Sequence, residues 1–198
     1  MKKLVLILLA LTIVAGCGGG RKVTRLDPAS TQDLSGKWND TDARLVAEEM
    51  IQDCLGRPWL TEFVSANTKK PAVVVGRIRN KSSEHIDTEV FTIDFERELI
   101  NSGQVDFVAN TLERDDVHEE REYQRDYASE ETVKQLRNEL GADFILLGSV
   151  KTIVDQEGGK QVKFYQTDLE LIDVESSRKV WIGTKKIKKG ISQGSTKW

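Results

Sequence analysis

The chain has 198 residues, of which 29 are basic and 32 acidic, and its formal net charge is −3. This length favours one domain with a sizeable core, and the balanced charge argues against a nucleic-acid-binding protein, which would carry an excess of Lys and Arg. The chain has only two cysteines, Cys17 and Cys54, which excludes a scaffold stapled by several disulfides.

The N-terminus, MKKLVLILLALTIVAGC, has the three parts of a secretory signal. Two lysines precede an apolar stretch from Leu4 to Val14, and two small residues stand before Cys17. A transmembrane helix needs roughly 20 apolar residues, which is more than this stretch supplies. We therefore expect residues 1–16 to direct export and then to be removed.

The last four residues of this stretch, V-A-G-C, resemble the lipobox of bacterial lipoproteins. The resemblance implies that the thiol of Cys17 is lipidated and that Cys17 becomes the mature N-terminus. Several acyl chains on one residue hold a protein stably on a membrane. Because Gly18 follows, and not Asp, the sorting rule of enteric lipoproteins implies an outer-membrane anchor that faces the periplasm. Residues 17–37 are rich in Gly, Ser and Thr, and we expect them to form a flexible lipidated tether.

The first half of the chain after the tether alternates helices and strands. Apolar residues at steps of three and four favour a helix from about 41 to 55, which ends at a Gly-Arg-Pro sequence. The run PAVVVGRIRN at 71–80 is typical of a central strand that is buried on both faces. Helical spacing returns in residues 85–103, and QVDFVAN at 104–110 favours a short strand.

The second half starts with a highly charged helix near 111–123, and a second helix near 129–140 follows with Ser129 as its N-cap. Three strands come next, all expected to be short, at 142–154, 160–174 and 178–190. These patterns predict one α/β domain over residues 38–190, with a single-layer antiparallel or mixed sheet of four to five strands flanked by about four helices. Residues 191–198 are expected to form a disordered tail.

Three residues are expected in the core of this domain. Cys54 falls at an apolar position of the first helix, and we expect it to be a buried small hydrophobe and not a reactive thiol. Phe144 and Trp181 lie on the final strands, and we expect both side chains to be buried in a single core.

The order of several segments resembles the LpoB family of lipoproteins that activate penicillin-binding proteins. The segments are LSGKWNDTDARLVAEEMI, VVVGRIRN, ELGADFILLGSV and TDLELIDVESSRKVWIG, and the resemblance extends from about Leu34 to Lys189. It implies a domain that docks on a class A penicillin-binding protein, the peptidoglycan synthase, and stimulates it without catalysis of its own. Some of these segments are shared more loosely with the secretion lipoprotein CsgG. The alternative is therefore a structural or assembly lipoprotein of the outer membrane with a CsgG-like domain.

The residues themselves give no positive support for an enzyme. The two histidines, His85 and His118, lie in separate segments, and the HEE sequence lacks the second histidine that a zinc-binding helix needs. Asp94 and Glu98 share a helix face with Arg97, which favours a charged surface over an acid/base pair. We therefore expect no catalytic residue, no metal ligand and no cofactor.

A partner-binding surface is expected in the charged helix and the QRDYAS loop after it. Tyr123, Arg125 and Tyr127 belong to the residue types that concentrate binding energy when they are desolvated. The alternative interpretation is a solvated surface, because runs of charge usually form one.

The predicted tether is short, since about 20 residues reach roughly 70 Å when fully extended. Anchoring in the inner membrane is therefore a second possibility.

Overall fold

The computed structural model describes residues 23–27, 30–129 and 139–192. Residues up to Ser30 form one unit, and the chain from Thr31 onward forms a second unit, which holds every helix and strand described below. The signal sequence, Cys17, residues 193–198 of the predicted tail and most of the helix predicted at 129–140 lie outside the described residues. The first two residues of the predicted tail, Ile191 and Ser192, are not disordered but end the last strand of the sheet. Within the described ranges, no helix has the length and apolar character that a membrane crossing requires.

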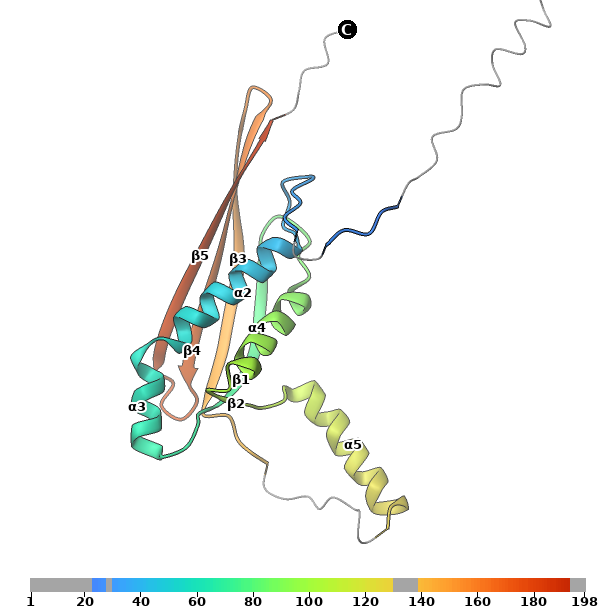
Figure 1. The fold of residues 1–198 in the computed structure, drawn as a ribbon, viewed down its shortest axis with the longest axis vertical. Coiled ribbons are helices and arrows are strands. Elements are labelled where there is room, and N and C mark those ends of the chain that lie inside the picture. The colour runs from blue at the N-terminus through green and yellow to red at the C-terminus, as the bar shows by residue number, and fades with distance from the viewer. Residues whose placement is uncertain (1–22, 28–29, 130–138, 193–198) are drawn as a thin grey trace, which may run out of the picture. The chain divides into compact units, whose positions relative to one another are not determined.

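Five strands of the second unit form one mixed sheet. They are β1 (Ala72–Lys81), β2 (Asp106–Phe107), β3 (Phe144–Glu157), β4 (Lys160–Asp173) and β5 (Lys179–Ser192). Their order in the sheet is β2-β1-β3-β4-β5 (Figure 1). β1 pairs in parallel with β2 and β3, whereas β3, β4 and β5 form an antiparallel meander.

Four described helices accompany this sheet, which confirms the predicted α/β fold with a mixed sheet. They are α2 (Asp40–Leu55), α3 (Pro58–Asn67), α4 (Thr88–Ser102) and α5 (Thr111–Tyr127). The start of α2 is fixed by a capping box, in which the side chains of Asn39 and Asp42 each accept a hydrogen bond from the other residue's backbone N–H at 3.0 Å. α4 ends at Gly103, whose φ of 63° lies in the left-handed region that favours glycine.

Helix α3 was not predicted from the sequence, because Pro58 was expected to end the preceding helix. Proline is well tolerated at the first position of a helix, where its missing N–H leaves no hydrogen bond unmade. The following residues, Trp59 and Leu60, are buried and hold the short helix on the domain. The indole Nε1 of Trp59 also donates to the carbonyl oxygen of Cys54 at 2.7 Å, which ties α3 to the end of α2.

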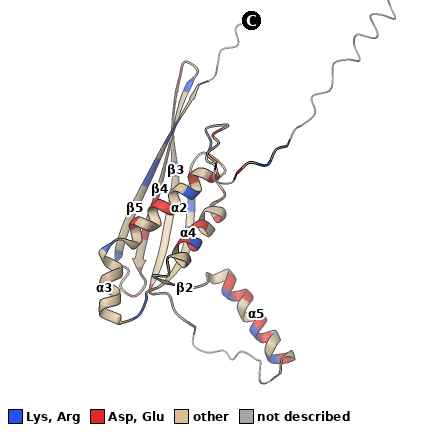
Figure 2. Cartoon of the chain, in the orientation of Figure 1, with Lys and Arg blue, Asp and Glu red and all other residues tan. Residues whose placement is uncertain are grey.

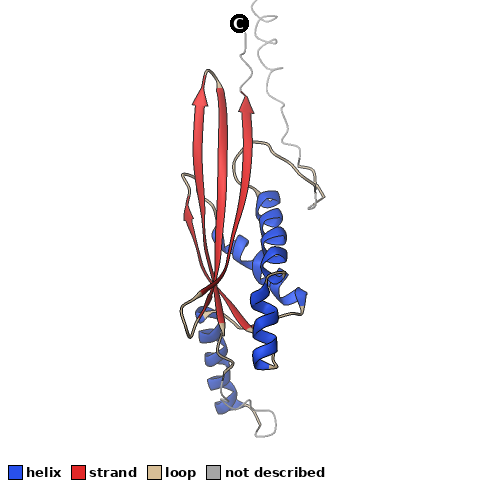
Figure 3. Ribbon diagram, turned by 90° about the vertical axis from the view of Figure 1, so that its left-hand side faces the viewer, coloured by secondary structure: helices blue, strands red, loops and turns tan. Residues whose placement is uncertain are grey.

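The core lies between the sheet and the helices α2 and α4, which pack on one face of it (Figure 3). Phe144 and Trp181 are 3% and 6% exposed and belong to one cluster, as predicted. Cys54 is 1% exposed, and its burial raises the pKa of the thiol to about 12, as expected for a small buried hydrophobe. Other fully buried members of the cluster are Val46, Phe91, Phe95, Val150, Leu169 and Leu171.

Two features of the sheet differ from those that the sequence predicts. β1 is not buried on both faces, because Val75 and Ile78 face the core whereas Arg77 and Arg79 are exposed. The strands predicted at 142–154, 160–174 and 178–190 are confirmed as β3, β4 and β5, but with 14 residues each they are long strands and not short ones. Gly158 and Gly159, both with positive φ, form the tight turn between β3 and β4. The two strands pair along their whole length, and they continue past the helices (Figures 1 and 3).

Residues 33–38, at the end of the predicted tether, contact the sheet. The ammonium group of Lys189 on β5 lies 2.6 Å from the carboxylate of Asp33 and 3.0 Å from the carbonyl oxygen of Lys37. The hydroxyl of Tyr165 lies 3.1 Å from the carbonyl oxygen of Gly36. This part of the chain is therefore held on the domain by polar contacts with β4 and β5.

The carboxylate of Glu84, in the loop after β1, extends this network. It accepts hydrogen bonds from the ammonium group of Lys163 at 2.6 Å, the hydroxyl of Tyr165 at 2.9 Å and the backbone N–H of Trp38 at 3.2 Å. Burial by itself raises the pKa of Glu84, but these donors outweigh it and hold that pKa below its ordinary value. Glu84 is thus an ionised link between three segments that are distant in sequence.

Candidate docking surface

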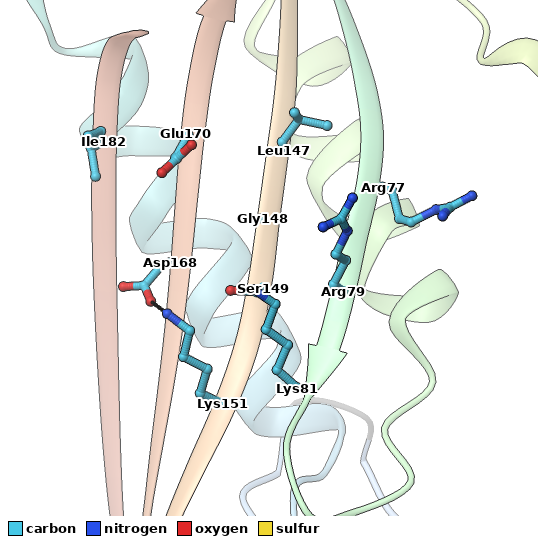
Figure 4. A pocket seen from close by; sticks show the side chains of 10 residues that line it. All are labelled: Arg77, Arg79, Lys81, Leu147, Gly148, Ser149, Lys151, Asp168, Glu170 and Ile182. Carbon is cyan, nitrogen blue, oxygen red and sulfur yellow. Dashed lines mark hydrogen bonds and ion pairs between the residues drawn. The ribbon is translucent and has the colours of Figure 1, made fainter.

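The sheet face opposite α2 and α4 carries a groove of about 490 Å³ (Figure 4). Its cationic side chains are Arg77, Arg79 and Lys81 on β1 and Lys151 on β3, and we call these four residues the basic patch. The groove is also lined by Leu147, Gly148, Ser149, Asp168, Glu170 and Ile182. A cationic face on a chain of net negative charge is a local feature that favours an acidic partner.

A register shift in β1 explains why its cations share one face. Strict alternation after Val73 and Val75 would turn Arg77 toward the core. The pairing with β3 shifts between Val75 and Ile78, so Ile78 takes the buried position and Arg77 turns outward. The signal for this shift was Gly76 inside an apolar strand, since glycine in a strand often marks a bulge.

The acidic side chains of the groove are largely satisfied by their neighbours. The carboxylate of Asp168 accepts hydrogen bonds at 2.8 Å from Lys151, Gln166 and Thr184. Burial alone raises the pKa of Asp168, but these donors outweigh it and hold that pKa below its ordinary value. Within the described part of the chain, Arg77, Arg79 and Lys81 form no ion pair, so the positive charge on β1 is available to a partner.

The predicted partner-binding residues lie on α5, and the structure brings only two of them together. Tyr123 and Tyr127 are 60% and 75% exposed, and their ring centroids lie 4.6 Å apart, one helical turn from each other. Arg125 lies on another side of the helix, with its Nε 3.9 Å from the carboxylate of Asp126. The expected QRDYAS loop is wrong over its first four residues, because α5 continues to Tyr127.

Figure 2 shows that α5 carries both acidic and basic residues, and these charges are segregated around the helix axis. Successive residues of an α-helix are rotated by about 100° around its axis. The residues that fall within roughly 60° of Leu112 in this rotation form a stripe along the helix, which contains four acids and no base. The residues of this stripe are Leu112, Asp115, Asp116, Glu119, Tyr123, Asp126 and Tyr127, and we call it the acidic face of α5. The three arginines of α5 fall on the other side. None of the described residues of α5 is buried.

The imidazole of His118 contacts a carboxylate. Its Nε2 lies 2.5 Å from the carboxylate of Glu139, which also accepts a hydrogen bond from Arg121 at 2.7 Å. These two contacts lower the pKa of Glu139. No group of three metal-ligating side chains gathers anywhere in the residues that the structure describes.

Residues 42–187 match the family model described as "Peptidoglycan-synthase activator LpoB". The chain belongs to this family. No curated protein sequence matches the chain. The similar solved structures include the LpoB C-terminal domain from Escherichia coli, with 16% identity and a TM-score of 0.43 over 77% of this chain and 99% of that one.

Two further structures are similar at lower TM-scores. The LpoB C-terminal domain from Salmonella enterica has 15% identity and a TM-score of 0.34, and the match covers 69% of this chain and 94% of that one. The PelC dodecamer from Paraburkholderia phytofirmans has 17% identity and a TM-score of 0.33, and the match covers 60% of this chain and 71% of that one.

Membership of this family decides the general role of the chain. The family is described as activators of peptidoglycan synthases, so the resemblance noted in the sequence is confirmed. Because peptidoglycan is made in the cell envelope, the protein acts there.

Proposed function

We propose that this protein is a periplasmic lipoprotein, anchored through Cys17, that binds a class A penicillin-binding protein and raises its peptidoglycan-synthase activity. The match of residues 42–187 to the activator family carries this proposal. The lipobox supports the anchor, and Gly18 supports the outer membrane as its site. The described groove and α5 support a role in protein contact, because both expose cationic or aromatic side chains.

We assign partner contact to the basic patch and to the tyrosine pair of α5. Arg and Tyr are enriched among the residues that dominate binding energy at protein interfaces. A basic patch accelerates encounter with an acidic surface and makes association sensitive to salt. The expected partner surface is therefore acidic around an apolar centre, which would meet Leu147 and Ile182 in the groove.

Recovery of a penicillin-binding protein from native membranes tests the proposed function. With the wild-type protein as bait, we expect a class A synthase to be recovered. The double variant Arg77→Glu with Arg79→Glu should recover at least about tenfold less, because reversed charges repel an acidic surface. Lys70→Glu, an exposed charge reversal before β1, serves as the control and should leave recovery unchanged. Bait that recovers no penicillin-binding protein contradicts the proposal.

The lipid anchor is tested by replacing Cys17 with Ser. We expect the variant to leave the membrane fraction for the soluble fraction, because it lacks the acylated thiol. Its thermal unfolding midpoint should equal that of the wild type, since the domain begins far from Cys17 in the sequence. Mass spectrometry of the wild type should show the acyl chains. A variant that stays on membranes, together with a wild type of unmodified mass, would rule out the anchor.

The role of α5 in partner contact is tested by Tyr127→Ala and Arg125→Ala. We expect each substitution to weaken binding to the recovered partner by more than about 1 kcal/mol, mostly through faster dissociation. Both side chains are exposed, so the thermal unfolding midpoint should not change. Surface plasmon resonance measures the two rate constants. Unchanged affinity in both variants would show that α5 is a solvated surface and not a docking surface.

A further inference from the structure

The connection from β2 to β3 has a topology that constrains where α5 belongs. β1, β2 and β3 are parallel, and β2 and β3 lie on opposite sides of β1. The chain therefore moves one way across the sheet from β1 to β2 and the opposite way from β2 to β3. The first of these crossovers contains α4, which packs on β1 and α2 on the core side.

Crossovers between parallel strands are right-handed in nearly all proteins. Two right-handed crossovers that run in opposite directions across a sheet must lie on opposite faces of it. Since α4 covers the core face, the connection from β2 to β3 belongs on the other face, which carries the groove. α5 is the described helix of this connection.

The charges of α5 and of the groove are complementary. The acidic face of α5 carries Asp115, Asp116, Glu119 and Asp126, whereas the groove carries the basic patch. Apolar side chains match as well, because the acidic face includes Leu112 and the two tyrosines. In the groove, Leu147 and Ile182 supply apolar surface, and Ile182 is 60% exposed.

The dimensions of the two surfaces also agree. A helix of 17 residues is about 26 Å long. Phe107, at the end of β2, pairs with Val73, and the eight steps of β1 from Val73 to Lys81 span about 26 Å. A helix that starts just after β2 and runs beside β1 therefore reaches the whole basic patch. The arginine side of α5 remains free to hold Glu139 through Arg121 and His118.

We infer that α5 is a lid that docks its acidic face on the basic patch and covers the groove of its own chain. In the closed state the lid covers the basic patch and turns its own tyrosine pair toward the groove. Both surfaces that the proposed function assigns to the synthase are then covered, so the synthase binds only after α5 is displaced. The basic patch thus binds either the acidic face of α5 or an acidic partner, but not both at once. The regulatory half of this inference, which is the competition between the lid and the synthase, rests on the proposed function. The closure of the lid does not.

Cross-linking of paired cysteines tests the closure without any partner. In the mature chain with Cys17→Ser, Lys151→Cys is combined with a second cysteine at position 115, 119 or 126 of α5, and a short bismaleimide is added. Cys54 is buried and should not react. We expect at least one pair to link within the monomer, and we expect the yield to fall several-fold as salt screens the charges.

Glu48→Cys on α2 paired with Glu119→Cys is the matched control, because α2 packs on the other face of the sheet. Closure is wrong if all three pairs link no better than this control at low salt. Links between two chains, seen as covalent dimers, would assign the acidic face to a second copy and would also overturn the internal lid.

Binding of the recovered synthase tests the regulatory half of the inference. The triple variant Asp115→Asn, Asp116→Asn and Glu119→Gln should bind about threefold or more tightly, because it raises the fraction of open protein. Glu120→Gln with Glu122→Gln, at the edges of the acidic face, should have a smaller effect. The cross-linked monomer should lose binding.

The outcomes separate closure from function. A monomer that links within itself but binds the synthase as well as the unlinked protein shows that the lid does not cover the partner surface, which overturns the regulatory half. A synthase that binds although no pair links overturns the closure and leaves the proposed function intact.

Discussion

Replacing Trp181 with Ala is expected to lower the free energy of unfolding by about 3 to 5 kcal/mol. The side chain is 6% exposed and belongs to the single core cluster. Its indole Nε1 donates to the carboxylate of Asp53 on α2 at 2.8 Å, and the ring lies against Gly183, where it leaves no room for a Cβ. The substitution removes this packing and leaves a cavity between β5 and α2. Chemical denaturation measures the loss.

The matched control is Ile182→Ala, one residue along the same strand. Adjacent residues of a strand point to opposite faces, and Ile182 is 60% exposed. Its substitution should change the free energy of unfolding by no more than about 0.5 kcal/mol, as is usual for surface positions. Equal effects of the two substitutions would contradict the register of β5.

Replacing Lys189 with Met is expected to cost about 3 to 5 kcal/mol of stability. The ammonium group of Lys189 lies 2.6 Å from the carboxylates of both Asp33 and Asp42, and its side chain is 8% exposed. Burial by itself lowers the pKa of Lys189, but hydrogen bonds to the two carboxylates outweigh it and raise that pKa. The substitution leaves the carboxylate of Asp42, which is 7% exposed, without its cation.

Two further variants separate charge from packing at this site. Lys188→Met, on the exposed face of the same strand, should change stability by no more than about 0.5 kcal/mol. Lys189→Met combined with Asp42→Asn should recover part of the loss, because a neutral amide costs less to bury than an unpaired carboxylate. If the double variant is as unstable as the sum of the single variants, the loss does not come from a buried unpaired charge.

Local signals predicted most of the helices and strands. The spacing of apolar residues in α2 and the strand pattern of β4 each depend on neighbours in the sequence, so they could be found without the fold. Two predictions were wrong because proline and glycine can each play more than one structural role. Pro58 begins α3 although proline also ends helices, and Gly76 marks a register shift in a strand that otherwise shows a continuous apolar run.

The candidate site was predicted only in part. Tyr123 and Tyr127 could be selected because they are aromatic residues among charges, and they do share one side of α5. The basic patch could not be selected, because Arg77 and Lys151 are far apart in the sequence and meet only through the pairing of β1 with β3. Arg125 was grouped with the tyrosines because a loop was expected where the helix continues.

The sequence by itself determined the identity of most elements, the family and the expected anchor at Cys17. These depend on residue order and on local periodicity, which are read directly from the chain. Only the tertiary structure decided which face of the sheet stays open, because the alternation in β1 does not say where α2 and α4 pack. It also decided that residues 33–38 bind the domain, since Lys189 meets Asp33 only after the whole sheet has formed.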